Sequence, residues 1–165
     1  MKKYEFTGET KEIKLLFRTA VLHRIRATVS FGFVKIGDLG GWIEKEENLS
    51  HEGKAWVCGD AEVCGDAKVW GNAEVCGDAK VFSASHVLVI GAIGSRNDFT
   101  TFYRDKDNEI TVKCGCFLGK IDRFLEKVTQ THGDSKYALV YRAAVEVAKL
   151  QIDLSGEAPK DADEE

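Results

Sequence analysis

The sequence contains no apolar run that approaches the roughly 20 residues a membrane-spanning helix needs. Its start, Met1-Lys2-Lys3, continues with Tyr-Glu-Phe, whereas a secretory signal would continue with an apolar core. A membrane-spanning protein and an exported protein are therefore both disfavoured. We expect a soluble protein located in the cytoplasm.

Cysteine and histidine are present, but in no pattern typical of a metal centre. The five cysteines are odd in number and include no Cys-x-x-Cys pair, which predicts reduced thiols. The four histidines are scattered along the chain, so a histidine-rich metal site is also disfavoured. No metal and no cofactor are predicted.

A large excess of one charge is lacking outside the end of the chain. The net charge of -4 comes from residues 153–165, which hold six acidic residues and one lysine. The remainder is close to neutral, so there is no electrostatic case for direct binding of nucleic acid or a membrane. At 165 residues, 44% of them hydrophobic, the chain is long enough for one compact domain or two small ones.

The most informative stretch runs from residue 55 to residue 84, where a motif of six residues occurs five times. It reads AWVCGD, AEVCGD, AKVWGN, AEVCGD and AKVFSA. In each copy Ala and Val are two apart, so both point to the same side of an extended chain, and the Gly-Asp or Gly-Asn pair suits a sharp corner. Short repeats of this kind indicate a solenoid, in which every unit buries its apolar side on the next. The predicted core positions are Ala55, Val57, Ala61, Val63, Ala67, Val69, Ala73, Val75, Ala79 and Val81.

These hexads resemble those of the hexapeptide-repeat proteins, a bacterial, transferase-like family. The resemblance implies a mainly β fold built on a short left-handed parallel β-helix of about three coils, with eighteen residues in each coil. Residues 37–44 and 48–53 are similar to the segment that enters the β-helix in that family. The overall layout, including residues 91–96 and 114–117, is also similar to hexapeptide-repeat proteins of phages and prophages.

The expected organisation has four parts. Residues 1–36 form an N-terminal β cap, and residues 37–94 form the left-handed β-helix. Residues 95–152 form a small α+β module that packs on the last coil, with one β-hairpin and two helices. The first helix begins near Lys120 and stops at Gly133, and the second is capped by Asp134 or Ser135 and ends near Ile152. Residues 153–165 are expected to be a disordered acidic tail.

Two histidines are weak catalytic candidates, because many proteins of the family that the hexads resemble are acyltransferases with a histidine general base. His51 and His86 both fall where the repeat is degraded. The five uninterrupted hexads leave no obvious place for the loop that holds an acyl donor in such enzymes. A partly buried or solvated histidine without a catalytic role is favoured at both positions, so no catalytic residue is predicted.

The outward position after each valine is apolar, while the outward position before it is mostly charged. Contiguous apolar surface marks an interface, so we expect self-association, and the resemblance favours a trimer. Alternatively, the C-terminal module folds over this surface. Cys58 and Cys76 are eighteen apart and should stack, but other hexads have aromatic residues at this position, which favours apolar surface over a zinc site. The predicted interface residues are Cys58, Cys64, Trp70, Cys76 and Phe82.

The outward position before each valine contains one notable pair. Glu62 and Lys80 are also eighteen apart, so they should lie one above the other on the surface. Such an exposed charge pair is worth at most about a few tenths of a kcal/mol.

A glycine-rich stretch at the end of the repeat suits an anionic ligand. Residues 91–96, GAIGSR, could present backbone N–H groups, a hydroxyl and a guanidinium to a phosphate. The stretch matches neither a dinucleotide fingerprint nor a P-loop, and a glycine turn that ends the solenoid is the simpler explanation. The candidate ligand-binding residues are Ser95, Arg96, Thr101, Tyr103, Arg104, His132 and Lys136.

Taken together, these patterns favour a non-catalytic oligomeric binding or scaffold protein of the phage type. It would hold a small anionic, nucleotide-like ligand or a host protein, with a use in countering a host defence. The alternative is a hexapeptide-repeat acyltransferase with a histidine general base. A purely structural assembly protein is the third hypothesis.

Overall fold

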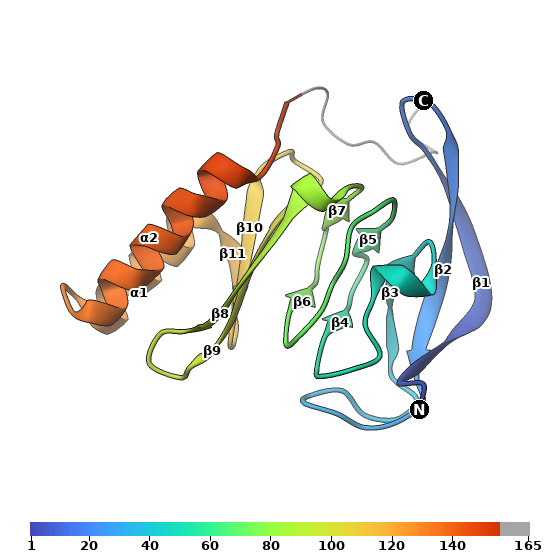
Figure 1. Ribbon diagram of the computed structural model, residues 1–165, viewed down its shortest axis with the longest axis horizontal. Coiled ribbons are helices and arrows are strands. Elements are labelled where there is room, and N and C mark those ends of the chain that lie inside the picture. Colours follow the sequence, from blue (N-terminus) through green and yellow to red (C-terminus); the bar gives the residue numbers. More distant parts are fainter. Residues whose placement is uncertain (156–165) are drawn as a thin grey trace.

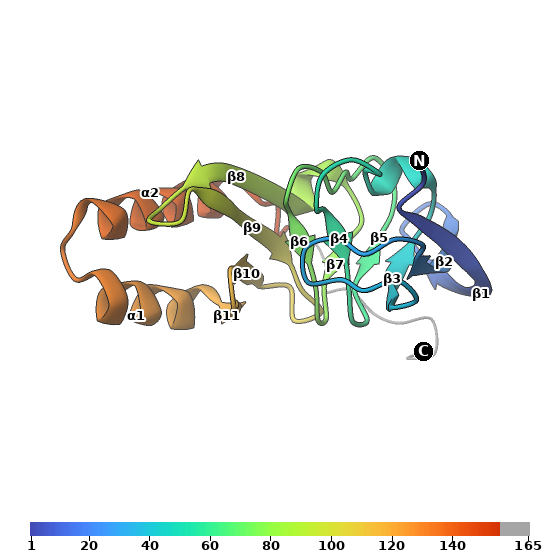
Figure 2. The same ribbon diagram turned by 90° about the horizontal axis from the view of Figure 1, so that it is seen from below.

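The computed structural model describes residues 1–155 of the chain. The elements follow one another along the longest axis of the molecule in the order of the sequence (Figure 1). The N-terminal strands lie at one end, the repeat lies next to them, and a second sheet with two helices forms the other end. Figure 2 shows the same order from below.

A five-stranded mixed sheet extends from the N-terminal strands into the repeat. Its strand order is β1-β2-β3-β5-β7, with the first two pairings antiparallel and the last two parallel. Ile13 and Leu22, on the N-terminal hairpin, are buried against Trp42. The strands are β1 (Tyr4–Lys14), β2 (Thr19–Ala27), β3 (Leu39–Ile43), β5 (Glu62–Val63) and β7 (Lys80–Val81).

The hexads stack in parallel with an offset of eighteen residues, as the pairs Trp56 with Glu74 and Glu62 with Lys80 show. Strands β4 (Trp56–Val57) and β6 (Glu74–Val75) form a separate two-stranded sheet. The ten predicted core alanines and valines are each at most 1% exposed, which confirms that prediction. The corner glycines have φ between 63° and 67°, a region that glycine adopts at low cost. These glycines are Gly59, Gly65, Gly71 and Gly77.

A four-stranded antiparallel sheet follows the repeat, in the order β11-β10-β9-β8. Two helices pack on it, α1 (Ile121–His132) and α2 (Lys136–Gln151). Short 3-10 helices precede β4 and β8, namely η1 (Glu46–Asn48) and η2 (Ala84–His86). The strands of the sheet are β8 (Val87–Ile93), β9 (Asp98–Arg104), β10 (Ile110–Cys114) and β11 (Phe117–Lys120).

The four-stranded sheet is packed on both faces because side chains alternate along its strands. On β9, Tyr103 lies in the core of the repeat, while Phe102 lies in the core under the helices. On β8, Val89 joins the first core and Ile90 joins the second. The sheet therefore separates the repeat from the helices and gives each of them one apolar face.

Local sequence explains the bounds of the two helices. Phe124 and Val128 are buried on one face of α1, and the helix ends at Gly133, which has a φ of 57°. Ser135 is the N-cap of α2, although its side chain makes no capping hydrogen bond. Both helices fall close to the predicted ranges.

The expected fold class is wrong. A mainly β protein built on a left-handed parallel β-helix of about three coils was expected, with one C-terminal hairpin. The described residues instead form three separate sheets and two helices, and the longest strands are antiparallel. The physical reason is that a hexad supplies only a two-residue strand between corners, so most of the regular structure lies outside the repeat.

Two further boundaries differ from expectation. Strand β8 belongs to the four-stranded sheet, so this sheet begins at residue 87, inside the range 37–94 assigned to the repeat. The predicted tail begins at residue 153, yet the Asp153 N–H donates to the Ser85 carbonyl at 2.9 Å and the Asn108 amide donates to the Leu154 carbonyl at 2.8 Å. The rest of that predicted tail lies outside the described residues.

Helices α1 and α2 are the α-helices of the described range 1–155. Neither of them has the length and the hydropathy that crossing a membrane requires.

Candidate functional site

A cavity of about 270 Å³ lies on the side of the four-stranded sheet that faces the helices. Four segments form it: the loop between β8 and β9, the start of β9, the turn between β10 and β11, and helix α1, with one residue from α2. The lining residues are Ile93, Ser95, Arg96, Asp98, Phe99, Thr100, Cys114, Gly115, Cys116, Phe117, Phe124, Lys127, Val128, Thr131, His132 and Tyr141.

The inner wall of the cavity is aromatic. Phe124 is buried, with its ring centroid 5.4 Å from that of Phe117 and 5.7 Å from that of Tyr141. The Phe117 side chain is only partly buried, so its ring is accessible from the cavity. A flat ring of a ligand would find an apolar stacking partner here.

The rim of the cavity is cationic. Arg96 from the loop and Lys127 from α1 are both exposed and line the opening, and His132 lies at the end of the same helix. Asp98 is the one carboxylate among the lining residues. Two permanent positive charges therefore face one negative charge, which favours an anionic ligand.

The guanidinium of Arg96 is positioned by the turn between β10 and β11. A Cβ placed on Gly115 would lie 2.9 Å from Arg96 Nη1, so the guanidinium, at the end of a flexible side chain, would have to shift slightly. Gly115 also has a φ of 57°, in the left-handed region. The left-handed backbone is therefore the main reason for glycine at this position.

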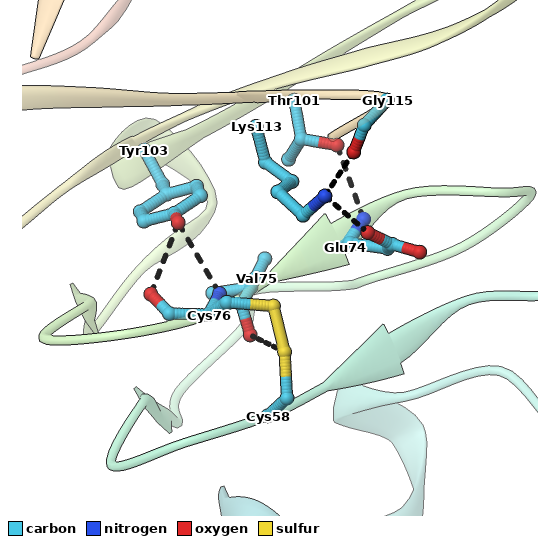
Figure 3. Close-up of a disulfide and its surroundings, with 8 residues drawn as sticks. All are labelled: Cys58, Glu74, Val75, Cys76, Thr101, Tyr103, Lys113 and Gly115. Carbon is cyan, nitrogen blue, oxygen red and sulfur yellow. Dashed lines mark hydrogen bonds and ion pairs between the residues drawn. A yellow bond between two sulfur atoms is a disulfide. The ribbon is translucent and has the colours of Figure 1, made fainter. Parts of the chain in front are cut away.

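This turn is tied to the repeat, as Figure 3 shows. Lys113 Nζ donates to the Gly115 carbonyl and forms an ion pair with Glu74 Oε2 at 3.1 Å. Next to it, the Glu74 N–H donates to Thr101 Oγ1 at 3.2 Å. These contacts join the turn between β10 and β11, which lines the cavity, to strand β6.

Tyr141 closes the back of the cavity against the loop between β8 and β9. A Cβ on Gly94 would lie 1.8 Å from the Tyr141 hydroxyl oxygen, so the phenol fits only against glycine. Burial, with a smaller contribution from Cys114, raises the pKa of Tyr141 to about 12. The phenol is therefore protonated at neutral pH and can donate a hydrogen bond.

Three of the seven predicted ligand-binding residues line this cavity: Ser95, Arg96 and His132. Lys136 stands at the start of α2 and is not part of the lining. The other three lie on the side of β9 that faces the repeat, where they hold the sheet in place. They are Thr101, Tyr103 and Arg104.

The contacts of Tyr103 and Arg104 are structural. The Tyr103 hydroxyl donates to the Cys76 carbonyl at 3.0 Å and accepts from the Cys76 N–H at 3.2 Å (Figure 3). Arg104 Nε donates to the Lys80 carbonyl at 2.9 Å, and its guanidinium lies 5.0 Å from the centre of the Phe82 ring. The period of two along β9 places Tyr103, with Thr101, on the face opposite Thr100, which lines the cavity. Arg104 is the last residue of the strand, where its side chain contacts Lys80 and Phe82 of the repeat.

The sequence analysis missed several lining residues, including Lys127, Phe117 and Tyr141. A signal for Lys127 was present: positions 124, 127, 128, 131 and 132 recur with the spacing of one helix face, and all of them line the cavity. Tyr141 lies within the second predicted helix, where no local pattern marks it as part of a cavity. No local pattern identifies Phe117, because its role depends on the fold of the sheet.

The two weak catalytic candidates lie outside the cavity lining. His51 stacks on Tyr4 with ring centroids 4.1 Å apart, and its Nδ1 accepts from the Lys3 N–H at 3.0 Å. The Nδ1 of His86 accepts from the Phe82 N–H at 3.1 Å. Burial lowers the pKa of both imidazoles, to about 4 for His86. Both rings are held by the chain itself, as expected for histidines without a catalytic role.

The five predicted interface residues do not form one exposed surface. Cys64 is fully buried beneath the N-terminal hairpin, together with the partly buried Phe82. Trp70 is 51% exposed and packs edge-on against Phe99 of β9. The apolar outward positions are therefore covered largely by other parts of the same chain.

The remaining two interface candidates correct the expectation of reduced thiols. Cys58 and Cys76 form a disulfide, with their Cα atoms 4.6 Å apart on stacked strands (Figure 3). The predicted stacking of these residues is confirmed, and it explains why the two sulfur atoms are close enough to bond. Cys64, Cys114 and Cys116 are free.

No protein-family model and no curated protein matches the sequence. Within residues 1–155, no group of three or more His, Cys, Asp or Glu side chains is arranged to hold a metal ion. The function must therefore be argued from the geometry of the cavity.

Proposed function

We propose that this protein binds a small anionic, nucleotide-like ligand in the cavity between the four-stranded sheet and helix α1. The observation that carries the proposal is the division of the lining into an aromatic wall and a cationic rim. A ligand with a planar ring and a phosphate group fits both parts at once.

Each part of such a ligand has a defined partner. The phosphate would accept charge-assisted hydrogen bonds from the fork of Arg96 and from Lys127. The ring would stack on Phe117, and the Tyr141 hydroxyl would donate to a polar atom at its inner end. The small residues of the loop between β8 and β9 would allow the phosphate to approach the Arg96 guanidinium closely.

The proposal is for binding without turnover. The two histidines considered as general bases lie outside the lining, which supports this choice. A protein that binds a nucleotide and does not convert it withdraws that nucleotide from solution, which is a use suited to countering a host defence. We keep the cytoplasm as the proposed compartment, with the free Cys64, Cys114 and Cys116 in its favour and the Cys58–Cys76 disulfide against it.

The direct test is titration calorimetry of the full chain with a panel of nucleoside monophosphates, diphosphates and cyclic nucleotides. Arg96→Ala and Lys127→Ala should each weaken binding by about tenfold to a hundredfold, because a charged hydrogen bond is worth about 1.5–3 kcal/mol. Arg26→Ala, which removes an exposed ion pair on the N-terminal hairpin, and Lys68→Ala, on the exposed side of the repeat, are the matched controls.

The controls should bind as the wild type does. If the panel contains a ligand whose affinity is unchanged in Arg96→Ala and Lys127→Ala, the binding site lies elsewhere and the proposal is wrong. If no nucleotide of the panel binds, the proposed ligand class is wrong.

A further inference from the structure

Asp98 supplies the only carboxylate among the residues that line the cavity, and it stands at the first position of β9. Side chains alternate along a strand, so Asp98 lies on the same face of the sheet as Thr100 and Phe102. Thr100 also lines the cavity, and Phe102 is buried in the core under the helices. Regular strand geometry therefore places the Asp98 carboxylate on the cavity side of the sheet.

This carboxylate keeps most of its hydrogen-bonding capacity for a ligand. Its Oδ1 accepts from the Phe99 N–H at 2.7 Å, which uses one of the lone pairs of that oxygen. The side chain is exposed and forms no ion pair within residues 1–155, although Arg96 stands only two positions earlier in the chain. Asp98 is therefore an acceptor that the rest of the described chain leaves largely unused.

The hydroxyl of Tyr141 lies at the same corner of the cavity as Asp98. This hydroxyl packs on Gly94, where a Cβ would lie 1.8 Å from its oxygen. Gly94 follows Ile93, which pairs with Asp98 across the end of the β8–β9 hairpin. Burial, then Cys114 and to a smaller extent the charge of Asp98 raise the pKa of Tyr141, as expected for neighbouring groups. The corner therefore offers one charged acceptor and one neutral donor.

A carboxylate in a site for an anion has to be explained, because it repels the phosphate of the ligand. Its charge favours binding only where it meets a positively polarised part of that ligand. Arg96 and Lys127 are the partners proposed for the phosphate, so the part of the ligand near Asp98 is the ring. The N–H groups at the edge of a nucleobase are such polarised groups, and they lie in the plane of the ring.

Guanine fits this corner better than the other common bases do. Its pairing edge presents two adjacent donors, N1–H and the 2-amino group, followed by the O6 acceptor. The two donors can meet both oxygens of one carboxylate, while O6 accepts from the Tyr141 hydroxyl. Adenine presents a single donor group at this edge, and so do cytosine and uracil. A carboxylate that receives two hydrogen bonds therefore selects guanine.

We propose that the cavity selects guanine nucleotides, with Asp98 accepting hydrogen bonds from N1–H and the 2-amino group of the base. This inference rests on the proposed function, because it names the base of the nucleotide that the cavity holds. The ring lies on Phe117 and its pairing edge is turned toward the loop between β8 and β9. Asp98 is thus the residue that determines specificity, and Arg96 and Lys127 supply affinity for any nucleotide.

The test is titration calorimetry of the full chain with the monophosphates of guanosine, inosine, adenosine and xanthosine. The wild type should bind guanosine monophosphate about tenfold to a hundredfold more tightly than adenosine monophosphate, which lacks one hydrogen bond to the charged carboxylate. The inosine nucleotide, without the 2-amino group, should lie between them. The xanthosine nucleotide should bind weakly, because its 2-carbonyl oxygen would face the carboxylate.

The decisive variant is Asp98→Asn, which keeps the shape of the side chain and an acceptor for the Phe99 N–H. Its amide donates where the carboxylate accepted, so binding of guanosine monophosphate should fall by about tenfold or more, and binding of xanthosine monophosphate should become tighter. The matched control is Asp122→Asn, an exposed carboxylate of α1 that does not line the cavity. The control should keep the affinities of the wild type.

The outcomes separate this inference from the proposed function. Equal binding of the guanosine and adenosine nucleotides, both lost in Arg96→Ala, would overturn the choice of base and leave the proposed function standing. The same change for all four nucleotides in Asp98→Asn would also overturn it, because the carboxylate would then act only through its charge on the phosphate. If none of the four binds, the inference is wrong, and the wider panel of nucleotides tests separately whether the cavity binds a nucleotide.

Discussion

Glu62 and Lys80 form an ion pair inside the molecule, with 3.0 Å between Glu62 Oε1 and Lys80 Nζ and side chains that are 1% and 8% exposed. They lie opposite each other on the parallel strands β5 and β7. Lys11 from the N-terminal hairpin adds a second cation 2.5 Å from Glu62 Oε2. The sequence predicted this stacking but placed it on the surface, because nothing local shows that the hairpin covers it.

Because the Glu62–Lys80 pair is buried, disrupting it should lower the free energy of unfolding more than disrupting an exposed ion pair. Removing the Glu62 charge takes away the carboxylate that Lys80 and Lys11 share in a largely buried site. Glu62→Gln should therefore lower the free energy of unfolding by about 3–5 kcal/mol, measured by urea denaturation. Glu5→Gln, which breaks an exposed pair with Arg26, should cost less than about 1 kcal/mol. Equal effects of the two substitutions would show that the Glu62 pair is solvated.

His86 should make stability depend on pH in a defined window. Burial, and then the charge of Arg104, lower the pKa of His86 from 6.5 to about 4. Between these values the unfolded chain binds a proton that the folded chain does not, so the contribution to stability is complete above 6.5 and is lost as the pH falls towards 4.

The matched variant for this prediction is His86→Asn, which keeps an acceptor near the Phe82 N–H and removes the titration. We expect the wild type to lose free energy of unfolding relative to His86→Asn as the pH falls through the window. The check is a series of urea denaturations monitored by tryptophan fluorescence. Parallel pH curves for the two proteins would contradict the assignment.

Gly94 should be required for the shape of the cavity. A Cβ there would lie 1.8 Å from the Tyr141 hydroxyl oxygen, and the φ of Gly94 is 77°. Gly133 is the matched control, since its φ is 57° and a Cβ there would meet nothing within 4 Å. Gly133→Ala should cost about 1–3 kcal/mol from backbone strain alone, because its ψ of −117° lies outside the left-handed helical region.

Gly94→Ala adds the displacement of Tyr141 to that cost. It should therefore destabilise the protein by more than Gly133→Ala and weaken nucleotide binding, which Gly133→Ala should leave unchanged. Thermal unfolding and calorimetry measure the two effects. The same loss in both variants would mean that Tyr141 can move aside freely.

Ligand binding should protect one thiol from alkylation. Cys116 is exposed at the cavity, so iodoacetamide should modify it in the folded protein, and a bound nucleotide should slow this reaction. Cys64 is fully buried, and burial raises its pKa to about 12, so it should react only after unfolding. Mass spectrometry of peptides distinguishes the sites. Unchanged modification of Cys116 in the presence of saturating nucleotide would count against binding in this cavity.

The local parts of the fold were readable from the sequence. The period of six placed the alanines and valines in the core and the glycines at the corners, because both depend only on chain geometry. Gly133 marked the end of α1 for the same reason. The fold class was wrong because sheet pairing between strands separated by a longer stretch of chain, such as β2 with β3, has no local signature.

The candidate site could also be predicted only in part from the sequence. Ser95 and Arg96 were identified from a short glycine-rich stretch, whose chemistry is local. Thr101 and Tyr103 were assigned to the same concavity, although alternation along a strand places them on the face opposite Thr100. Phe117 and Tyr141 both pack against Phe124 only because the helices fold back over the sheet, and no sequence pattern predicts these contacts.

The most direct test of the central claim is a crystal structure of the full chain soaked with the nucleotide that binds best in the calorimetric panel. The account predicts ring density against Phe117 and phosphate density within hydrogen-bond distance of Arg96 and Lys127. A nucleotide bound at any other place, with this cavity holding only solvent, would contradict it.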